Sequence, residues 1–276
     1  MGSPLNLKRR HSAAGEATDD RISRLPDSVL SLILSFVPTT DAMRASVLST
    51  RWKHLFASAS NLLFDDSLVV FDFHKRGGKR RKTDLVLFNS FVSFVYRVAT
   101  LTVLKLTMNG AELNVLASVR FSSMKILHLR SMVLVDDGSV KRLFAGCSVL
   151  EDLLIKFCNF NRMKVVDISI PTLLRLTIDG RTSNYEIPPY EIVFDFPLLG
   201  YLNYVDFEAK GYEWKNLENS LVEAHVNIRP VCGMRSIAGL KVVNFLKGIY
   251  NVSSLHLIND YLLVSFLHFL FVSVNS

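Results

Sequence analysis

Residues capable of covalent chemistry are few in this sequence. The three cysteines, Cys147, Cys158 and Cys232, form an odd set with no paired spacing. That set argues against the disulfide framework of a secreted domain and lacks the paired ligands of a cysteine–histidine zinc module. A thioester mechanism needs an activated thiol, whereas Cys147 and Cys158 flank apolar segments, so we expect buried structural thiols. No glycine-rich phosphate loop, nucleophile elbow or zinc-protease motif occurs, so we predict no catalytic residue and no cofactor.

Two histidines, His225 and His256, occupy the same place in successive units of a repeated pattern described below. Adjacent strands lie about 4.8 Å apart, a separation that a metal ion can bridge. The sequence offers no evident third ligand, so we predict no metal site. A pH-sensitive contact or two solvated side chains are the alternatives.

The main charge cluster is the run HKRGGKRRK at residues 74–82, in which six of nine residues are lysine or arginine. Such runs are typical of nuclear import signals and acidic-partner patches, and also of solvated loops, here turning at Gly77 and Gly78. No stacking aromatic residues interleave the cluster, so we expect no nucleic-acid partner. We expect a location in the nucleus, the cytoplasm or both.

Composition indicates a folded chain outside the membrane. The 276 residues are 49% hydrophobic and 21% charged, with a net charge of +7. The first twenty residues hold no apolar segment of a secretory signal. The apolar tail from Tyr261 to Val274 has 14 residues, whereas a spanning helix needs about 20. We expect that tail to be a core strand or helix, or an aberrant terminus.

Residues from 20 to about 60 have the spacing of three short helices. Pro26 suits a helix start, where Asp27 and Ser28 can accept hydrogen bonds from the first turn. Spacing of i, i+3, i+4 and i+7 defines one apolar face: Leu30, Ile33, Leu34 and Val37. A second apolar face consists of Val29, Leu32 and Phe36. A helix with two apolar faces must bury the second one, either against its own chain or against another protein.

The pattern Leu-x-x-Leu-x-Leu recurs through the rest of the chain. Seven units begin at positions 101, 124, 150, 173, 199, 221 and 252, at intervals of 23, 26, 23, 26, 22 and 31. The first five intervals match leucine-rich repeats. In each unit the fourth and sixth positions should point into a core, and the third and fifth outward onto one continuous face. The outward residues predicted to contact a protein substrate are Lys105, His128, Asp152, Arg175, Tyr201, Asn203, Glu223, His225 and His256.

The segment DRISRLPDSVLSLILSFVPTTDAMRASVLSTRWKHLF closely resembles the F-box. This resemblance implies docking on the Skp-type adaptor of cullin–RING ubiquitin ligases. The implied interface or motif-core residues are Leu25, Pro26, Leu30, Ile33, Leu34, Val37, Pro38, Val47, Leu48 and Trp52. Trp52 is either an interface anchor or a tryptophan buried within the motif.

The repeats resemble a plant family that joins an F-box to irregular leucine-rich repeats. The segment SSMKILHLRSMVLVDDGSVKRLFAGCSVLEDLLIKFCNF is similar to its hallmark unit, and the likeness runs from about residue 20 to 259. The family often ends in an FBD domain, and we expect this chain to lack one. The resemblance implies a substrate-recognition adaptor of an SCF-type ubiquitin ligase, which binds an unidentified protein substrate. A repeat scaffold without a ligase link and a truncated non-functional paralogue are the alternatives.

The predicted fold is α/β: a short three-helix F-box, then an irregular leucine-rich-repeat solenoid with a horseshoe-like parallel sheet. The predicted boundaries are a disordered tail at 1–19, the F-box at 20–66, a basic loop and linking helix at 67–98, leucine-rich repeats at 99–260 and an atypical apolar tail at 261–276.

Overall fold

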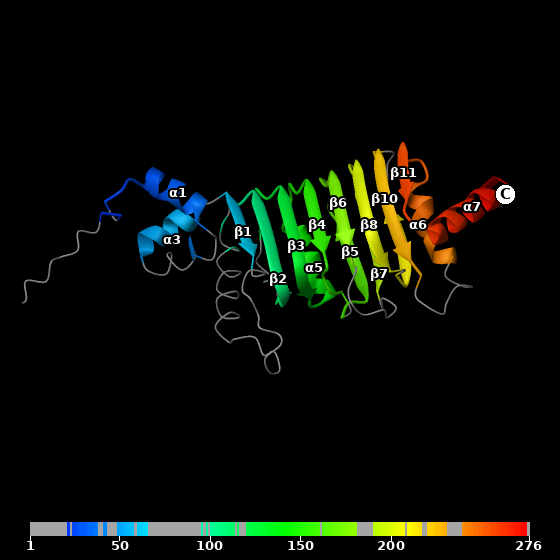
Figure 1. The fold of residues 1–276 in the computed structure, drawn as a ribbon, viewed down its shortest axis with the longest axis horizontal. Coiled ribbons are helices and arrows are strands. Elements are labelled where there is room, and N and C mark those ends of the chain that lie inside the picture. The colour runs from blue at the N-terminus through cyan, green and yellow to red at the C-terminus, as the bar shows by residue number, and fades with distance from the viewer. Residues whose placement is uncertain are drawn as a thin grey trace, which may run out of the picture.

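Parallel strands stacked side by side form the body of the protein, with short helices at both ends (Figure 1). The computed structural model describes residues 21–22, 24–37, 41–42, 49–57, 60–65, 95, 98, 100–113, 115, 120–160, 162–180, 190–207, 209–216, 220–230 and 239–274. The predicted disordered tail at 1–19 and all but residues 95 and 98 of the predicted loop and linking helix lie outside these ranges.

The larger sheet has eight strands in the order β1-β2-β3-β4-β6-β8-β10-β11, and all neighbours run parallel. A smaller parallel sheet, β5-β7-β9, forms a second layer. The strands of the larger sheet are β1 (Asn61–Asp65), β2 (Val103–Leu113), β3 (Ile126–Leu134), β4 (Asp152–Lys156), β6 (Arg175–Asp179), β8 (Tyr201–Phe207), β10 (Glu223–Arg229) and β11 (Ser254–Leu257). Those of the smaller sheet are β5 (Val165–Ser169), β7 (Glu191–Asp195) and β9 (Gly211–Lys215).

The structure confirms the repeat pattern and its register. The third positions of the seven units align in one row across the sheet, from Val103 on β2 to Ser254 on β11. The fourth and sixth positions are buried in the first six units, while Leu255 and Leu257 of the last unit are half-buried. Each unit thus continues the core of its neighbour, as expected for a solenoid.

Strand β1 is an eighth strand that the repeat pattern did not predict. Its Leu62 and Phe64 are buried, and it pairs with β2 from Asn61 opposite Val103. The strand lies inside the range 20–66 expected for the F-box, so the sheet begins at residue 61. The start of β1 is held to the first repeat unit through Ser60, whose carbonyl accepts hydrogen bonds from the backbone N–H groups of Thr102 and Val103.

Behind the larger sheet lie the smaller sheet and α5 (Asp137–Ala145), which packs on β5. Asp136 caps α5 by accepting a hydrogen bond of 2.8 Å from the backbone N–H of Ser139. An acceptor at this place satisfies one of the N–H groups left open in a first helical turn. This second layer closes the back of the solenoid core.

Two helices, α6 (Gly239–Ile249) and α7 (Asp260–Val274), lie at the far end of the sheet (Figure 1). The fully buried Phe245 of α6 lies within 5.0–5.9 Å, between ring centroids, of Tyr204, Tyr212, Trp214 and Phe194. Gly248 permits this approach, because a Cβ there would collide with the indole ring of Trp214. The two helices thus cover the end of the repeat core.

The apolar tail, expected as a strand, a helix or an aberrant terminus, is the helix α7. It packs on α6 and β10 and buries Leu262 fully, while Leu263, Val264 and Leu267 are exposed. Among the helices in the described ranges, none combines the length and the apolar character needed to cross a membrane.

At the other end lie α1 (Asp27–Phe36) and α3 (Thr50–Ala57), drawn in blue in Figure 1. Of the second predicted helix only Asp41 and Ala42 are described, and both are helical. Pro26 stands at the start of α1, as expected, and forms no side-chain cap bond, while acceptance of first-turn hydrogen bonds by Asp27 or Ser28 stays a prediction. Asp27 binds the guanidinium of Arg51 on α3 at 2.6 Å, which also donates to the carbonyl of Leu25. This bridge fastens α3 to the start of α1.

Candidate docking surfaces

The first candidate surface is the exposed apolar face of α1. Leu30 is completely buried, with 0% of its surface exposed. Val29, Leu32, Ile33 and Phe36 are exposed by 38%, 57%, 38% and 80%. Leu30 is therefore a residue of the motif core and not of an interface. The second apolar face of α1, which we expected to be buried against the chain itself or against another protein, is exposed in this structure. Ile33, predicted on the first face, is exposed as well.

The remaining predicted F-box residues are divided between interior and surface. Leu25, Leu34, Val37 and Trp52 are half-buried, and Pro26 is exposed. Pro38, Val47 and Leu48 lie outside the described residues. Docking by any of these side chains stays a prediction. Phe36 is the most exposed apolar residue of α1, and the sequence placed it only on the second apolar face.

The second candidate surface is the outward face, which we define as the sheet face carrying the third and fifth positions of the repeat units. Six of its nine predicted residues lie in the half of the sheet formed by β6, β8, β10 and β11. The guanidinium of Arg175 lies 5.1 Å from the ring centroid of Tyr201, and that ring lies 5.8 Å from His225. His225 in turn stacks on His256 at 4.3 Å, with the rings 3° from parallel. Four side chains from four strands therefore form one continuous row.

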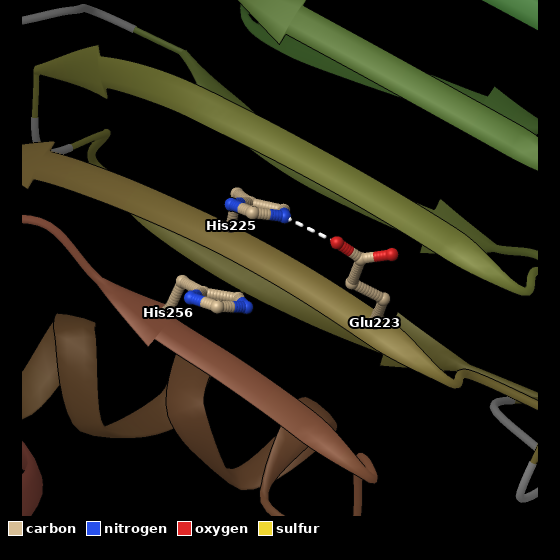
Figure 2. Close-up of side chains that lie close together, drawn as sticks. All are labelled: Glu223, His225 and His256. Carbon is tan, nitrogen blue, oxygen red and sulfur yellow. Dashed lines mark hydrogen bonds and ion pairs between the residues drawn. The ribbon is translucent and has the colours of Figure 1, made fainter.

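Glu223 joins this row beside the two histidines, as Figure 2 shows. Its carboxylate Oε1 lies 2.6 Å from Nε2 of His225, within hydrogen-bonding distance. Glu223 and His225 are two residues apart on β10, so both side chains lie on the same face of the sheet. His256 pairs with His225 in the strand register and reaches the same point from β11. The sequence placed Glu223 on this face and paired the two histidines, but it did not identify Glu223 as a third ligand beside them.

The other predicted residues of the outward face are more dispersed. His128 lies 3.6 Å from the carboxylate of Asp152 on the next strand, too far for a hydrogen bond. Lys105 is in register with His128, and Asn203 with His225. The register confirms where these residues lie on the face, whereas their contact with a substrate stays a prediction.

The described cysteines are buried as expected. Desolvation raises the pKa of the Cys147 thiol to about 12, and burial raises the pKa of Cys158 to about 12 as well. Both groups are therefore protonated at neutral pH, whereas a thiol nucleophile reacts as the thiolate. Cys232 and the basic run at 74–82 lie outside the described residues.

A register-aligned parallel sheet of leucine-rich units, preceded by a helical segment with an exposed apolar face, defines a leucine-rich-repeat protein with an N-terminal helical segment. A family model of the F-box domain matches residues 22–64. A second model, described as "FBD-associated F-box protein At5g56370, LRR repeats", matches residues 68–209. The chain belongs to this plant family of F-box/LRR-repeat proteins.

Curated relatives come from Arabidopsis thaliana. The F-box/LRR-repeat protein At3g59200 is 33% identical over 76% of this chain and 50% of its own length. At3g59250 is 31% identical over 86% of this chain and 60% of its own length, and At4g14103 is 31% identical over 76% and 68%. The chain thus spans about half to two thirds of the length of these relatives. No solved structure matches.

Proposed function

We propose that the chain is a non-catalytic substrate receptor of an SCF-type cullin–RING ubiquitin ligase. The observation that carries this proposal is the exposed apolar face of α1 within the matched F-box range. Exposed apolar groups gathered on one short helix typically mark a protein interface. We assign this face to the Skp-type adaptor and the outward face of the sheet to a protein substrate.

This arrangement supports catalysis by proximity. A receptor that holds a substrate and an adaptor at once raises the effective concentration of the substrate lysines near the ubiquitin-loaded enzyme. The protonated, buried state of Cys147 and Cys158 agrees with transfer by partner enzymes and not by this chain. The proposed location is the nucleus, the cytoplasm or both, in keeping with the basic run at 74–82.

Purified chain mixed with a Skp-type adaptor should give a complex of one copy of each, visible by size-exclusion chromatography with light scattering. Failure of the two folded proteins to elute together at micromolar concentration would contradict the proposal. Cytochrome c, a basic protein unrelated to F-box proteins, serves as a control for nonspecific association through charge.

The second candidate function is a repeat scaffold in which the helical segment only caps the solenoid. One observation favours it: Ala42 belongs to the same cluster of buried side chains as Leu62 and Phe64 of β1, and Leu34 packs against that cluster. Deleting residues 1–60 separates the two functions, since the sheet begins at residue 61. A docking module predicts repeats that still unfold cooperatively by circular dichroism but no longer bind the adaptor. A cap predicts repeats that lose their structure.

A further inference from the structure

We propose that Glu223, His225 and His256 form a binding site for one divalent transition-metal ion, with Zn²⁺ as the representative ion. One ligand atom from each side chain lies within 4.8 Å of the other two. The three residues come from two adjacent strands held in register by the sheet, so the backbone fixes their approach. The inference is independent of the function proposed for the F-box.

The chemistry of the three ligands selects the class of metal. Two imidazoles and one carboxylate suit Zn²⁺ and its neighbours in the transition series, whereas Mg²⁺ and Ca²⁺ prefer oxygen ligands throughout. Three protein ligands also leave a fourth tetrahedral position for water or for a group on another molecule. That position would face outward, because all three side chains lie on the outward face.

Small movements convert the observed arrangement into a coordination sphere. Ligand atoms around a tetrahedral Zn²⁺ lie about 3.3 Å apart, given bonds of about 2.0 Å. The metal must lie near the plane of each imidazole ring, so the stacked rings of His225 and His256 cannot both bind without one of them turning. His256 is exposed, and by turning it exchanges its 3.0 Å contact with Ser254 Oγ for a bond to the ion. The ion then takes the place of the hydrogen bond between His225 Nε2 and the Glu223 carboxylate, and the neutral ring of His225 keeps its one proton on Nδ1.

A bound ion would cross-link β11 to β10 at the end of the larger sheet. The two strands pair over only four residues, from Glu223 opposite Ser254 to Val226 opposite Leu257. An ion that binds the folded chain and not the unfolded one stabilises the fold by an amount that grows with the logarithm of its concentration above the dissociation constant. Zinc should therefore raise the melting temperature as well as bind.

Calorimetric titration of the untagged full chain with ZnCl2 tests the site. Wild-type protein should bind one more Zn²⁺ ion than His256→Ala or Glu223→Gln, and MgCl2 should give no comparable heat. The matched control is His128→Ala, which removes an outward-face histidine that has a carboxylate neighbour but no second histidine. Its zinc stoichiometry should equal that of the wild type.

Thermal unfolding gives a second measurement that does not depend on counting ions. Zinc should raise the melting temperature of the wild type and of His128→Ala, and the increase should be lost in His256→Ala. His256 is exposed, so its replacement should leave the metal-free melting temperature unchanged. Equal zinc stoichiometry and equal zinc-induced shifts in wild type and His256→Ala would overturn the proposal, as would the same losses in His128→Ala.

Discussion

Replacing Ile33 and Phe36 together by aspartate is expected to weaken binding to a Skp-type adaptor by at least about 100-fold. The two residues are three apart on α1, on the same exposed face, and Phe36 is the most exposed large apolar residue described. Burying a carboxylate in an apolar interface costs several kcal/mol unless a partner pairs with it. Loss of a single interface hot spot already costs about 2 kcal/mol or more. Titration calorimetry with purified adaptor measures the change.

The control for this experiment is Leu198→Asp with Val222→Asp. These residues are also exposed apolar groups, but they lie in the repeat body, just before β8 and β10. Their replacement adds the same charge and should leave adaptor affinity within about twofold, because exposed sites away from an interface contribute little. Equal loss of affinity in both double variants would refute the assignment of the adaptor to α1.

Leu30 is unsuitable for such a test, although the sequence pairs it with Ile33 on one face. Its side chain is completely buried. A charge placed there would lack both solvent and a partner, so Leu30→Asp should unfold the helical segment. Lost binding would then report on folding and not on contact. Burial decides which apolar residues of an F-box can be probed by charge.

Replacing Phe245 by alanine is expected to lower the free energy of unfolding by about 3–5 kcal/mol. The ring is fully buried and contacts four aromatic rings contributed by β7, β8 and β9. Alanine would remove most of its buried area and leave a cavity that those rings, held by their own strands, can fill only in part. Urea unfolding followed by circular dichroism measures the change.

The matched control is Leu267→Ala, an exposed apolar residue of α7. Its free energy of unfolding should stay within about 0.5 kcal/mol of the wild type. A Phe245→Ala effect below about 1 kcal/mol would contradict the conclusion that α6 closes the solenoid core. Together the two variants distinguish the loss of a buried α6 side chain from a general sensitivity of the C-terminal helices to substitution.

The repeat body was predictable because each unit repeats one local rule. A side-chain period of two, with buried groups at the fourth and sixth positions, places every strand in the same register as its neighbour. Strand β1 escaped prediction because Leu62 and Phe64 lack the leading leucine of a unit. The cluster around Phe245 was also missed, because its members meet only through contacts between segments distant in sequence.

The candidate sites were predictable in part for the same reason. Two apolar faces on α1 follow from helical spacing, but packing decides which of them is open, and it buries Leu30. Register alone brings His225 beside His256. The role of Glu223 as a third ligand had a signal in the sequence: a Glu-x-His spacing within one strand places both side chains on one face.

The most direct test of the central claim is whether the chain links a cullin to the adaptor. Immobilised chain should retain a purified cullin–RING pair only when the Skp-type adaptor is also present, because contact with the cullin runs through the adaptor. The Ile33→Asp, Phe36→Asp variant should retain neither. A substrate receptor of an SCF-type ligase predicts adaptor-dependent retention of the cullin. Absence of cullin in the presence of the adaptor, or equal retention without it, would contradict the proposed function.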